Sequence, residues 1–212
     1  MYNTFRRYGS YIYAEKLPQL LQRHKIERLN FSQQGMTWNN QWIRIIFSGE
    51  KKWNLDGPDE RKYHWHDLRK EKEIFSKCQL GGCSVMTWGC FSYNGVGSIA
   101  FVSGKMNSRA YQSVLASHLS PNAGENWKCQ PDNAPTHSSN STKNWFQVNN
   151  VETLKWPAKS PDLNTIKNVW GDFSRRVYAN GRNFTSSIEL KSTIEDEWYE
   201  TNPQLCQKKF HP

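Results

Sequence analysis

The chain contains no long apolar run, and this absence excludes a protein anchored by a membrane-spanning helix. None of its apolar stretches approaches the roughly 20 residues that such a helix needs. The N-terminus lacks the apolar core of a secretory signal, and no internal repeat or low-complexity segment is present. We therefore expect an intracellular globular protein with no membrane partner.

Cysteine is sparse, and its spacing gives no sign of a bound metal. The five residues are Cys78, Cys83, Cys90, Cys129 and Cys206, an odd number with no C-x-x-C pair. This pattern indicates neither a disulfide framework nor a zinc site, and a reducing compartment fits it best. We expect a nuclear protein if the chain acts on eukaryotic DNA, although its short basic pairs form no nuclear-localisation run.

Acidic residues are outnumbered by basic ones. The chain has 28 Lys and Arg against 19 Asp and Glu, a net charge of +9 and a pI of about 9.3. This balance favours a polyanionic partner, most simply nucleic acid, and the alternative is a soluble basic protein without such a role. Only 36% of the residues are hydrophobic, but ten Trp, nine Tyr and ten Phe make a packed core plausible because each buries a large area.

Hydrophobic patterning predicts an α/β domain. Strands are predicted at residues 43–47, 52–55, 84–91, 98–102, 127–131 and 151–154, and helices at 18–34, 107–119, 136–148, 163–178 and 186–199. Strands come first, and helices and strands then alternate, which predicts a mixed sheet covered by helices. This order matches a ribonuclease-H-like fold without singling it out.

Two short segments carry a resemblance to a known family. Residues 130–137 read Gln-Pro-Asp-Asn-Ala-Pro-Thr-His, and residues 160–170 read Ser-Pro-Asp-Leu-Asn-Thr-Ile-Lys-Asn-Val-Trp. Thirty-four residues separate Asp132 in the first from Lys167 in the second. Further matches lie at residues 42–47, 50–52, 54–59, 63–69, 81–82, 84–86, 88–89 and 156–158. In this order, the segments resemble the DDE catalytic domain of Tc1/mariner-type (Tc1/Tc3-like) transposases.

The resemblance implies a ribonuclease-H-like fold and metal-dependent cleavage and strand transfer of DNA. In that family, three carboxylates hold two Mg²⁺ or Mn²⁺ ions, which activate the attacking oxygen and stabilise the leaving oxygen at a phosphate. Here Asp132 keeps the second position, whereas Gly49 stands at the first and Lys167 at the third. Asp132 is thus the surviving catalytic and metal-ligand position, and we expect no productive metal binding.

Neighbouring acids do not replace the missing ones convincingly. Glu50 follows Gly49, but successive side chains of a strand point to opposite faces, and only a β-bulge would re-aim it. Asp162 belongs to the turn motif that the family shares. Asp172 lies five residues after Lys167, roughly 140° around a helix.

Several of these residues also have a purely structural interpretation. Asp132 alone would be a turn or N-cap residue, and Lys167 alone a solvated helix lysine after a cap at Asn164. His137 either approaches a substrate or begins a helix. The segment His64-x-His66-Asp67 looks like a metal site, but the resemblance favours a surface or structural role.

Basic residues are the candidates for DNA contacts. Contacts of Lys and Arg with phosphate depend on salt and read no sequence, and the alternative is a charged solvent-exposed face. The residues concerned are Lys51, Lys52, Arg69, Arg175 and Arg176, with Arg61, Lys62, Lys70 and Arg182 beside them.

The resemblance also divides the chain. Residues 1–40 are predicted to be the remnant of a linker after DNA-binding modules that this sequence does not show. Residues 41–200 are predicted to form the catalytic domain, and residues 201–212 a flexible tail. DNA is the expected partner, and a homodimer is left open. The alternatives to a degenerate catalytic domain are a DNA-binding or protein-interaction module without enzymatic activity, and a decayed transposon remnant.

Overall fold

A mixed five-stranded sheet lies at the centre of the computed structural model, which describes residues 19–58, 84–104, 106–119 and 126–210. The strands are β1 (Ile45–Asn54), β2 (Ser84–Ser92), β3 (Gly95–Val102), β4 (Lys128–Gln130) and β5 (Glu152–Thr153). Their order is β3-β2-β1-β4-β5; β1, β2 and β3 are antiparallel, and β4 and β5 run parallel to β1.

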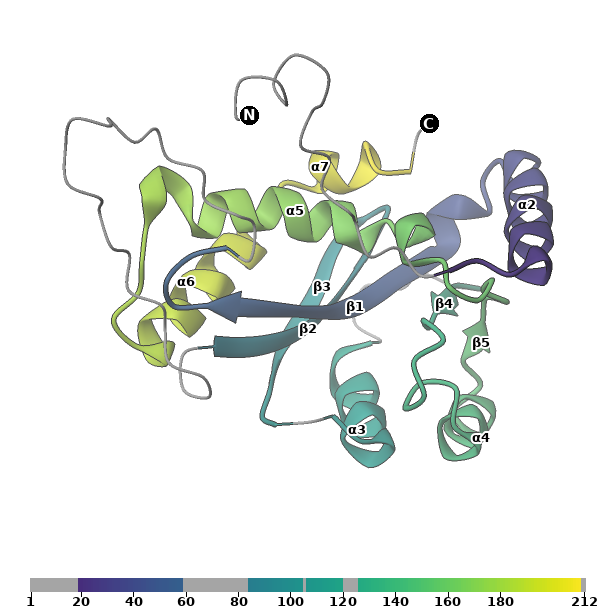
Figure 1. Ribbon diagram of the computed structural model, residues 1–212, viewed down its shortest axis with the longest axis horizontal. Helices are drawn as coiled ribbons and strands as arrows, with labels where there is room; N and C mark the ends of the chain where they lie inside the picture. Colours follow the sequence, from purple (N-terminus) through teal and green to yellow (C-terminus); the bar gives the residue numbers. More distant parts are fainter. Residues whose placement is uncertain (1–18, 59–83, 105, 120–125, 211–212) are drawn as a thin grey trace, which may run out of the picture.

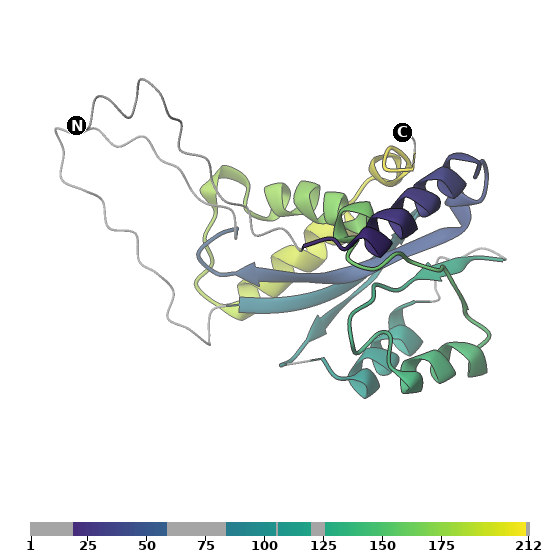
Figure 2. The same cartoon turned by 45° about the vertical axis from the view of Figure 1, so that its right-hand side comes forward.

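Helices cover both faces of this sheet (Figures 1 and 2). On one face lie α5 (Ile166–Val177), α6 (Ser187–Tyr199) and α7 (Pro203–Gln207), and on the other lie α3 (Ser108–His118) and α4 (Asn140–Val148). Helix α2 (Gln22–Met36) stands at the end of the molecule near β4, and the 3₁₀ turns are η1 (Trp42–Arg44), η2 (Pro161–Leu163) and η3 (Ala179–Gly181). The architecture confirms the predicted α/β class with a mixed sheet flanked by helices.

The larger core lies between the sheet and α5, as the hydrophobic spacing of this helix predicts. Ile166, Phe173 and Val177 are each 0% exposed. The indole rings of Trp170 and Trp198 stack with their centroids 4.9 Å apart above Gly89. A side-chain carbon on Gly89 would lie 2.8 Å from the Trp170 ring, so this close approach of helix and strand requires glycine.

Strand β1 corrects one prediction. We expected one strand at residues 43–47 and a second at residues 52–55, but β1 is continuous from Ile45 to Asn54. Every residue from Phe47 to Asn54 pairs with β2 in an unbroken register, with Gly49 opposite Gly89. Pairing along the whole ladder thus keeps the glycine within the strand, although glycine weakens a strand interior.

The C-terminal segment corrects a second prediction. Residues 201–212 were expected to be a flexible tail, but residues 203–207 form α7, which packs on β2 and β3. Pro203 stands in its first turn, and the Asn202 side chain accepts a hydrogen bond from the Gln204 N–H. Cys206 is 0% exposed, and the Phe210 ring packs against Phe47 and Phe91. Apolar burial, absent from the sequence-based reasoning, orders this segment.

The other elements agree with their predicted positions to within a few residues. In the part of the chain that the structure describes, no helix is long and apolar enough to cross a membrane. Helix α4 begins at Asn140 rather than near Thr136, because the preceding residues form a turn that is tied to Asp132. That turn belongs to the candidate site.

Candidate functional site

Two neighbouring parallel strands bring the first two candidate positions together. Phe47 of β1 and Gln130 of β4 are paired, and Gly49 and Asp132 each lie two residues beyond this pair. Because side chains alternate along a strand, Gly49 lies on the same face of β1 as Phe47, which is the face that α5 covers. The start of α5, which carries Lys167, lies over the same end of β1. The structure therefore brings together the three positions that the sequence motifs indicate.

Asp132 is held by its own turn and by a histidine. Its Oδ1 accepts a hydrogen bond of 2.9 Å from the Ala134 N–H and a short one from His137 Nδ1. The His137 side chain is only 3% exposed, and its ring stacks on Tyr111 with centroids 3.8 Å apart. Asp132 is thus both the turn residue of the structural interpretation and a member of a polar group around the buried His137. His137 lies in the turn before α4 and does not begin that helix.

Glu50 joins this group from the opposite face of β1. Its Oε1 lies 3.1 Å from His137 Nε2, so the imidazole bridges Glu50 and Asp132 with both ring nitrogens. The β1–β2 register shows no shift at Glu50, so no bulge re-aims the side chain toward Gly49. Glu50 and Gly49 thus point to opposite faces of β1, as predicted. Glu50 is connected to Asp132 through His137.

Lys167 occupies the space next to Gly49. A side-chain carbon on Gly49 would lie 3.7 Å from Lys167 Nζ and 3.1 Å from Ile166 Cγ2. Asn164 fixes this start of α5 to the strand, because its Nδ2 donates to the Ser48 carbonyl at 3.0 Å and its Oδ1 accepts from the Ile166 N–H. The capping role predicted for Asn164 is thus present, together with a bond to β1 that the sequence did not indicate.

The charges of the group are coupled. Burial alone would lower the pKa of His137, but its hydrogen bonds to Asp132 and Glu50 outweigh burial and raise this pKa from 6.5 to about 9. Burial alone would raise the pKa of Asp132, and the bond and charge of His137, the Ala134 N–H and the charge of Lys167 together lower it. The hydrogen bond between Asp132 and His137 therefore favours the charged form of both residues.

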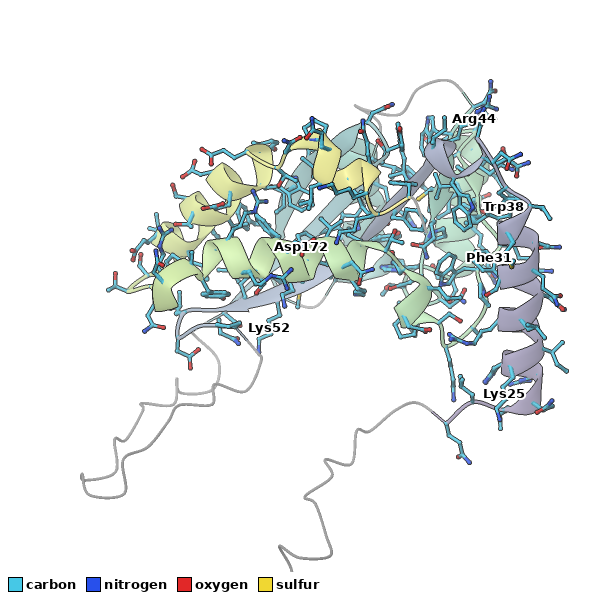
Figure 3. The ribbon with its side chains drawn as sticks, turned by 90° about the horizontal axis from the view of Figure 1, so that it is seen from above. Lys25, Phe31, Trp38, Arg44, Lys52 and Asp172 are labelled. Atoms are coloured by element: carbon cyan, nitrogen blue, oxygen red, sulfur yellow. The ribbon has the colours of Figure 1, made fainter. Side chains whose placement is uncertain are left out.

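Helix α2 braces the loop that leads to Lys167. Arg28 donates two hydrogen bonds to the carboxylate of Asp162 at 2.7 and 2.6 Å. The Phe31 ring meets the Trp156 ring edge-on with centroids 5.0 Å apart, and Figure 3 shows Phe31 and Trp38 on the side of α2 that faces the rest of the molecule. Asp162 lies in the turn η2, as its assignment to the turn motif predicts, and it holds α2 in place through Arg28.

The predicted DNA-contacting residues lie apart from one another. The Lys51 ammonium lies 5.5 Å from the centre of the Trp53 ring, and Lys52 is exposed on β1 (Figure 3). Arg175 is exposed and pairs with Asp172. Arg176 is half-buried and donates to Thr201 Oγ1 at 2.5 Å, so its guanidinium is engaged inside the molecule. Arg182 is exposed at the end of η3.

Other candidates fall outside the described residues. These are Arg61, Lys62, Arg69, Lys70 and the segment His64-x-His66-Asp67. Within the described part of the chain, no three His, Cys, Asp or Glu side chains are grouped so that they could hold a metal ion.

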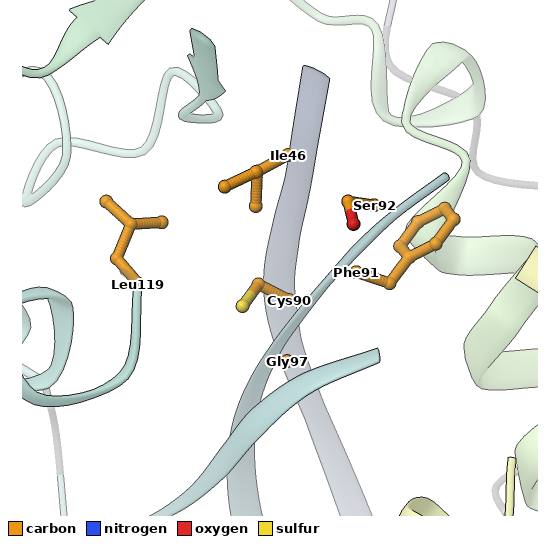
Figure 4. Close-up of a pocket in the computed structure, with 6 residues that line it drawn as sticks. All are labelled: Ile46, Cys90, Phe91, Ser92, Gly97 and Leu119. Carbon is orange, nitrogen blue, oxygen red and sulfur yellow. The ribbon is translucent and has the colours of Figure 1, made fainter. Parts of the chain in front are cut away.

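A small pocket lies in the core on the α3 side of the sheet, and Asp132 is not among its lining residues (Figure 4). No charged side chain lines it, and burial raises the pKa of the Cys90 thiol to about 12, so this thiol stays protonated at neutral pH. The pocket offers no reactive group for chemistry. Its lining residues are Ile46, Cys90, Phe91, Ser92, Gly97 and Leu119.

Sequence reasoning missed the Glu50–His137–Asp132 connection. The contact between His137 and Asp132 could have been predicted from the sequence. The two residues are five positions apart in a Pro-containing segment, and a turn of this length can bring their side chains together. The contact with Glu50 could not be read from spacing, since it joins residues 87 positions apart.

Comparisons with known proteins agree with this geometry. The family described as "DDE superfamily endonuclease" matches residues 44–191. The Tc3 transposase of Caenorhabditis elegans is 44% identical over 203 residues, which are 92% of this chain and 61% of that protein. The Tcb1 transposase of Caenorhabditis briggsae is 32% identical over 191 residues, which are 86% of this chain and 69% of that protein.

Solved structures show the same fold. The catalytic domain of Mos1 mariner transposase superposes with a TM-score of 0.64 at 17% identity and covers 93% of this chain and 91% of its own. The Mos1 transposase paired-end complex with the left transposon end gives a TM-score of 0.74 at 18% identity, with coverage of 99% of this chain and 65% of that one. The sheet order and the flanking helices are those of a ribonuclease-H-like domain.

Proposed function

This chain belongs to the Tc1/mariner family of DDE transposases, and we propose that it retains the scaffold of the catalytic domain without the metal-dependent cleavage and strand transfer of DNA. The proposal concerns this chain alone, because the chain spans 61% of the length of the Tc3 relative. The Lys167 ammonium beside Gly49, where acids would be needed, is the observation that carries it.

The donor set of the site does not fit a pair of divalent ions. Mg²⁺ and Mn²⁺ prefer several hard oxygen ligands, and a two-metal site needs carboxylates that bridge or flank both ions. Gly49 and Lys167 offer no ligand, and Oδ1 of Asp132 already accepts two hydrogen bonds. The Lys167 charge also repels a cation, and its proximity is seen in the lowered pKa of Asp132.

Glu50 does not restore the missing first acid. Its carboxylate lies on the other face of β1 and is joined to His137. A metal ion shared by Glu50 and Asp132 would have to displace the buried imidazolium, which the two carboxylates hold in place from both ring nitrogens. The single remaining acid, Asp132, is therefore the remnant of the catalytic set.

A cleavage and strand-transfer assay tests this proposal. Purified protein is incubated with DNA that carries Tc1/mariner-type inverted repeats, in the presence of Mg²⁺ or Mn²⁺, and products are resolved on a denaturing gel. We expect no product above that of the Asp132→Ala variant. Turnover by the unaltered chain that Asp132→Ala abolishes would refute the proposal.

The segment assignments and the setting are part of the proposal. Residues 1–40 are proposed to be the remnant of a linker that follows DNA-binding modules, and α2 is the part of it that docks on the scaffold. Residues 41–200 are the catalytic scaffold, and the setting of its action is the nucleus, where its DNA partner resides.

A second candidate function is metal-independent DNA binding by the same scaffold. The net charge of +9 favours it, because Lys and Arg bind phosphate without a metal ion. Binding that falls steeply with salt and ignores EDTA is the expected result. A decayed remnant would show neither binding nor cleavage.

A further inference from the structure

Resting on the proposed loss of the metal site, we propose that Lys167 binds a backbone phosphate of DNA directly, at the place where the family's third metal-ligating acid stands. The ligand class is a DNA phosphodiester, and no divalent ion takes part. The site consists of the Lys167 ammonium in front of Gly49, with the Glu50–His137–Asp132 group beside it.

The first step of the argument is that the Lys167 charge is available. Lys167 is an exposed residue, and its ammonium forms no ion pair within the described part of the chain. Three other cations are used internally: Arg28 pairs with Asp162, and Arg175 and Lys209 pair with Asp172. An unpaired ammonium held near a buried strand is a ready partner for a phosphate oxygen.

The second step concerns space. Lys167 Nζ lies 3.7 Å from the point that a Gly49 side-chain carbon would occupy, and glycine leaves that point empty. A side chain at position 49 would lie in contact with the ammonium. Gly49 and Lys167 therefore act together, one by leaving room and the other by supplying the charge.

The third step concerns the two carboxylates nearby, which would otherwise repel a phosphate. His137 donates a hydrogen bond to each of them, and its side chain is only 3% exposed. Both carboxylates are thus engaged by the buried histidine, whereas Lys167 is exposed. The ammonium can therefore attract phosphate at short range, and removing a carboxylate should strengthen that attraction.

Fluorescence anisotropy with a labelled 30-base-pair duplex tests the inference, in buffer with EDTA over a series of salt concentrations. We expect the unaltered chain to bind, and Lys167→Ala to weaken binding about tenfold. The slope of log K against log salt should fall in magnitude by about 0.9, the value for one lost phosphate contact. Lys167→Arg should preserve most of the affinity, and Asp132→Asn should raise it.

Lys143→Ala is the matched control, because this lysine is exposed on α4 at the other face of the sheet. Circular dichroism of each variant confirms that it is folded. An unchanged affinity and slope in Lys167→Ala, an equal effect of Lys143→Ala, or weaker binding by Asp132→Asn would each overturn the inference. Tighter binding of an RNA duplex of the same length would overturn the assignment to DNA.

The two proposals fail separately. Cleavage of the duplex in Mg²⁺ that depends on Asp132 would refute the proposed loss of activity, whatever the binding result. If Lys167→Ala leaves DNA affinity in EDTA unchanged, and no cleavage occurs in Mg²⁺, only the proposed phosphate site is refuted.

Discussion

The buried imidazolium of His137 should make the stability of this protein fall as pH rises from 6.5 to 9. Its pKa is raised from 6.5 to about 9, because the hydrogen bonds and charges of Asp132 and Glu50 outweigh the effect of burial. A group whose pKa is higher in the folded state stabilises the fold fully below its unfolded value. That contribution is lost as the pH rises to the folded value.

The size of the effect follows from the two pKa values. A difference of about 2.5 pKa units corresponds to about 3 kcal/mol, at about 1.4 kcal/mol for each pH unit. Other shifted groups act outside this interval. The pKa of His118 is lowered by burial, so its contribution changes below pH 6.5, and burial raises the pKa of the Cys90 thiol from 9.0 to about 12, so its contribution is lost above pH 9.

Urea unfolding followed by tryptophan fluorescence at pH 6.5, 7.3, 8.2 and 9 measures this dependence. The control variant is His137→Gln, which keeps a polar side chain of similar length but cannot carry the charge. We expect the difference in unfolding free energy between the two proteins to shrink by about 3 kcal/mol across the series. Parallel curves would show that His137 is not charged in the folded state and would refute the assignment.

Two further predictions concern the docking of α2 and the packing of α5. A double-mutant cycle with Arg28→Ala and Asp162→Ala should give a coupling energy of about 0.5–1 kcal/mol, since the pair is bidentate but partly exposed, and a value of zero would contradict the brace. Gly89→Ala should destabilise the fold by about 1–3 kcal/mol, because the new carbon meets the Trp170 ring at 2.8 Å. Gly171→Ala should stabilise the fold by about 0.5–1 kcal/mol, because alanine favours the helix and its new carbon has no atom within 4 Å. Equal effects of the two glycine changes in chemical denaturation would contradict this packing.

Local sequence patterns predicted the strands and helices that carry a regular apolar spacing. The spacing of Ile166, Phe173 and Val177 indicated α5, which buries one face. The alternation around Trp88 indicated β2, although the structure buries this strand on both faces. The resemblance placed Asp132 and Lys167 at one site; in the structure, Lys167 lies beside Gly49 and its charge contributes to the lowered pKa of Asp132.

The errors came from interactions between distant segments. β1 continues through Gly49 because the β2 ladder supports it, and the pairing partner lies about forty residues away. Helix α7 forms because Cys206 and Phe210 find an apolar surface on the sheet, which no local pattern reveals. The link between Glu50 and His137 likewise needs the fold first, because it joins β1 to a turn far along the chain.

Calorimetric titration with Mn²⁺ tests the central claim most directly, with the unaltered chain compared with the double variant Gly49→Asp/Lys167→Glu. The double variant restores both acids, and Ile166 must shift slightly because its Cγ2 lies 3.1 Å from the new side-chain carbon at position 49. We predict no heat of specific binding in the unaltered chain and saturable binding in the double variant. Saturable Mn²⁺ binding by the unaltered chain that disappears in Asp132→Ala would contradict the account.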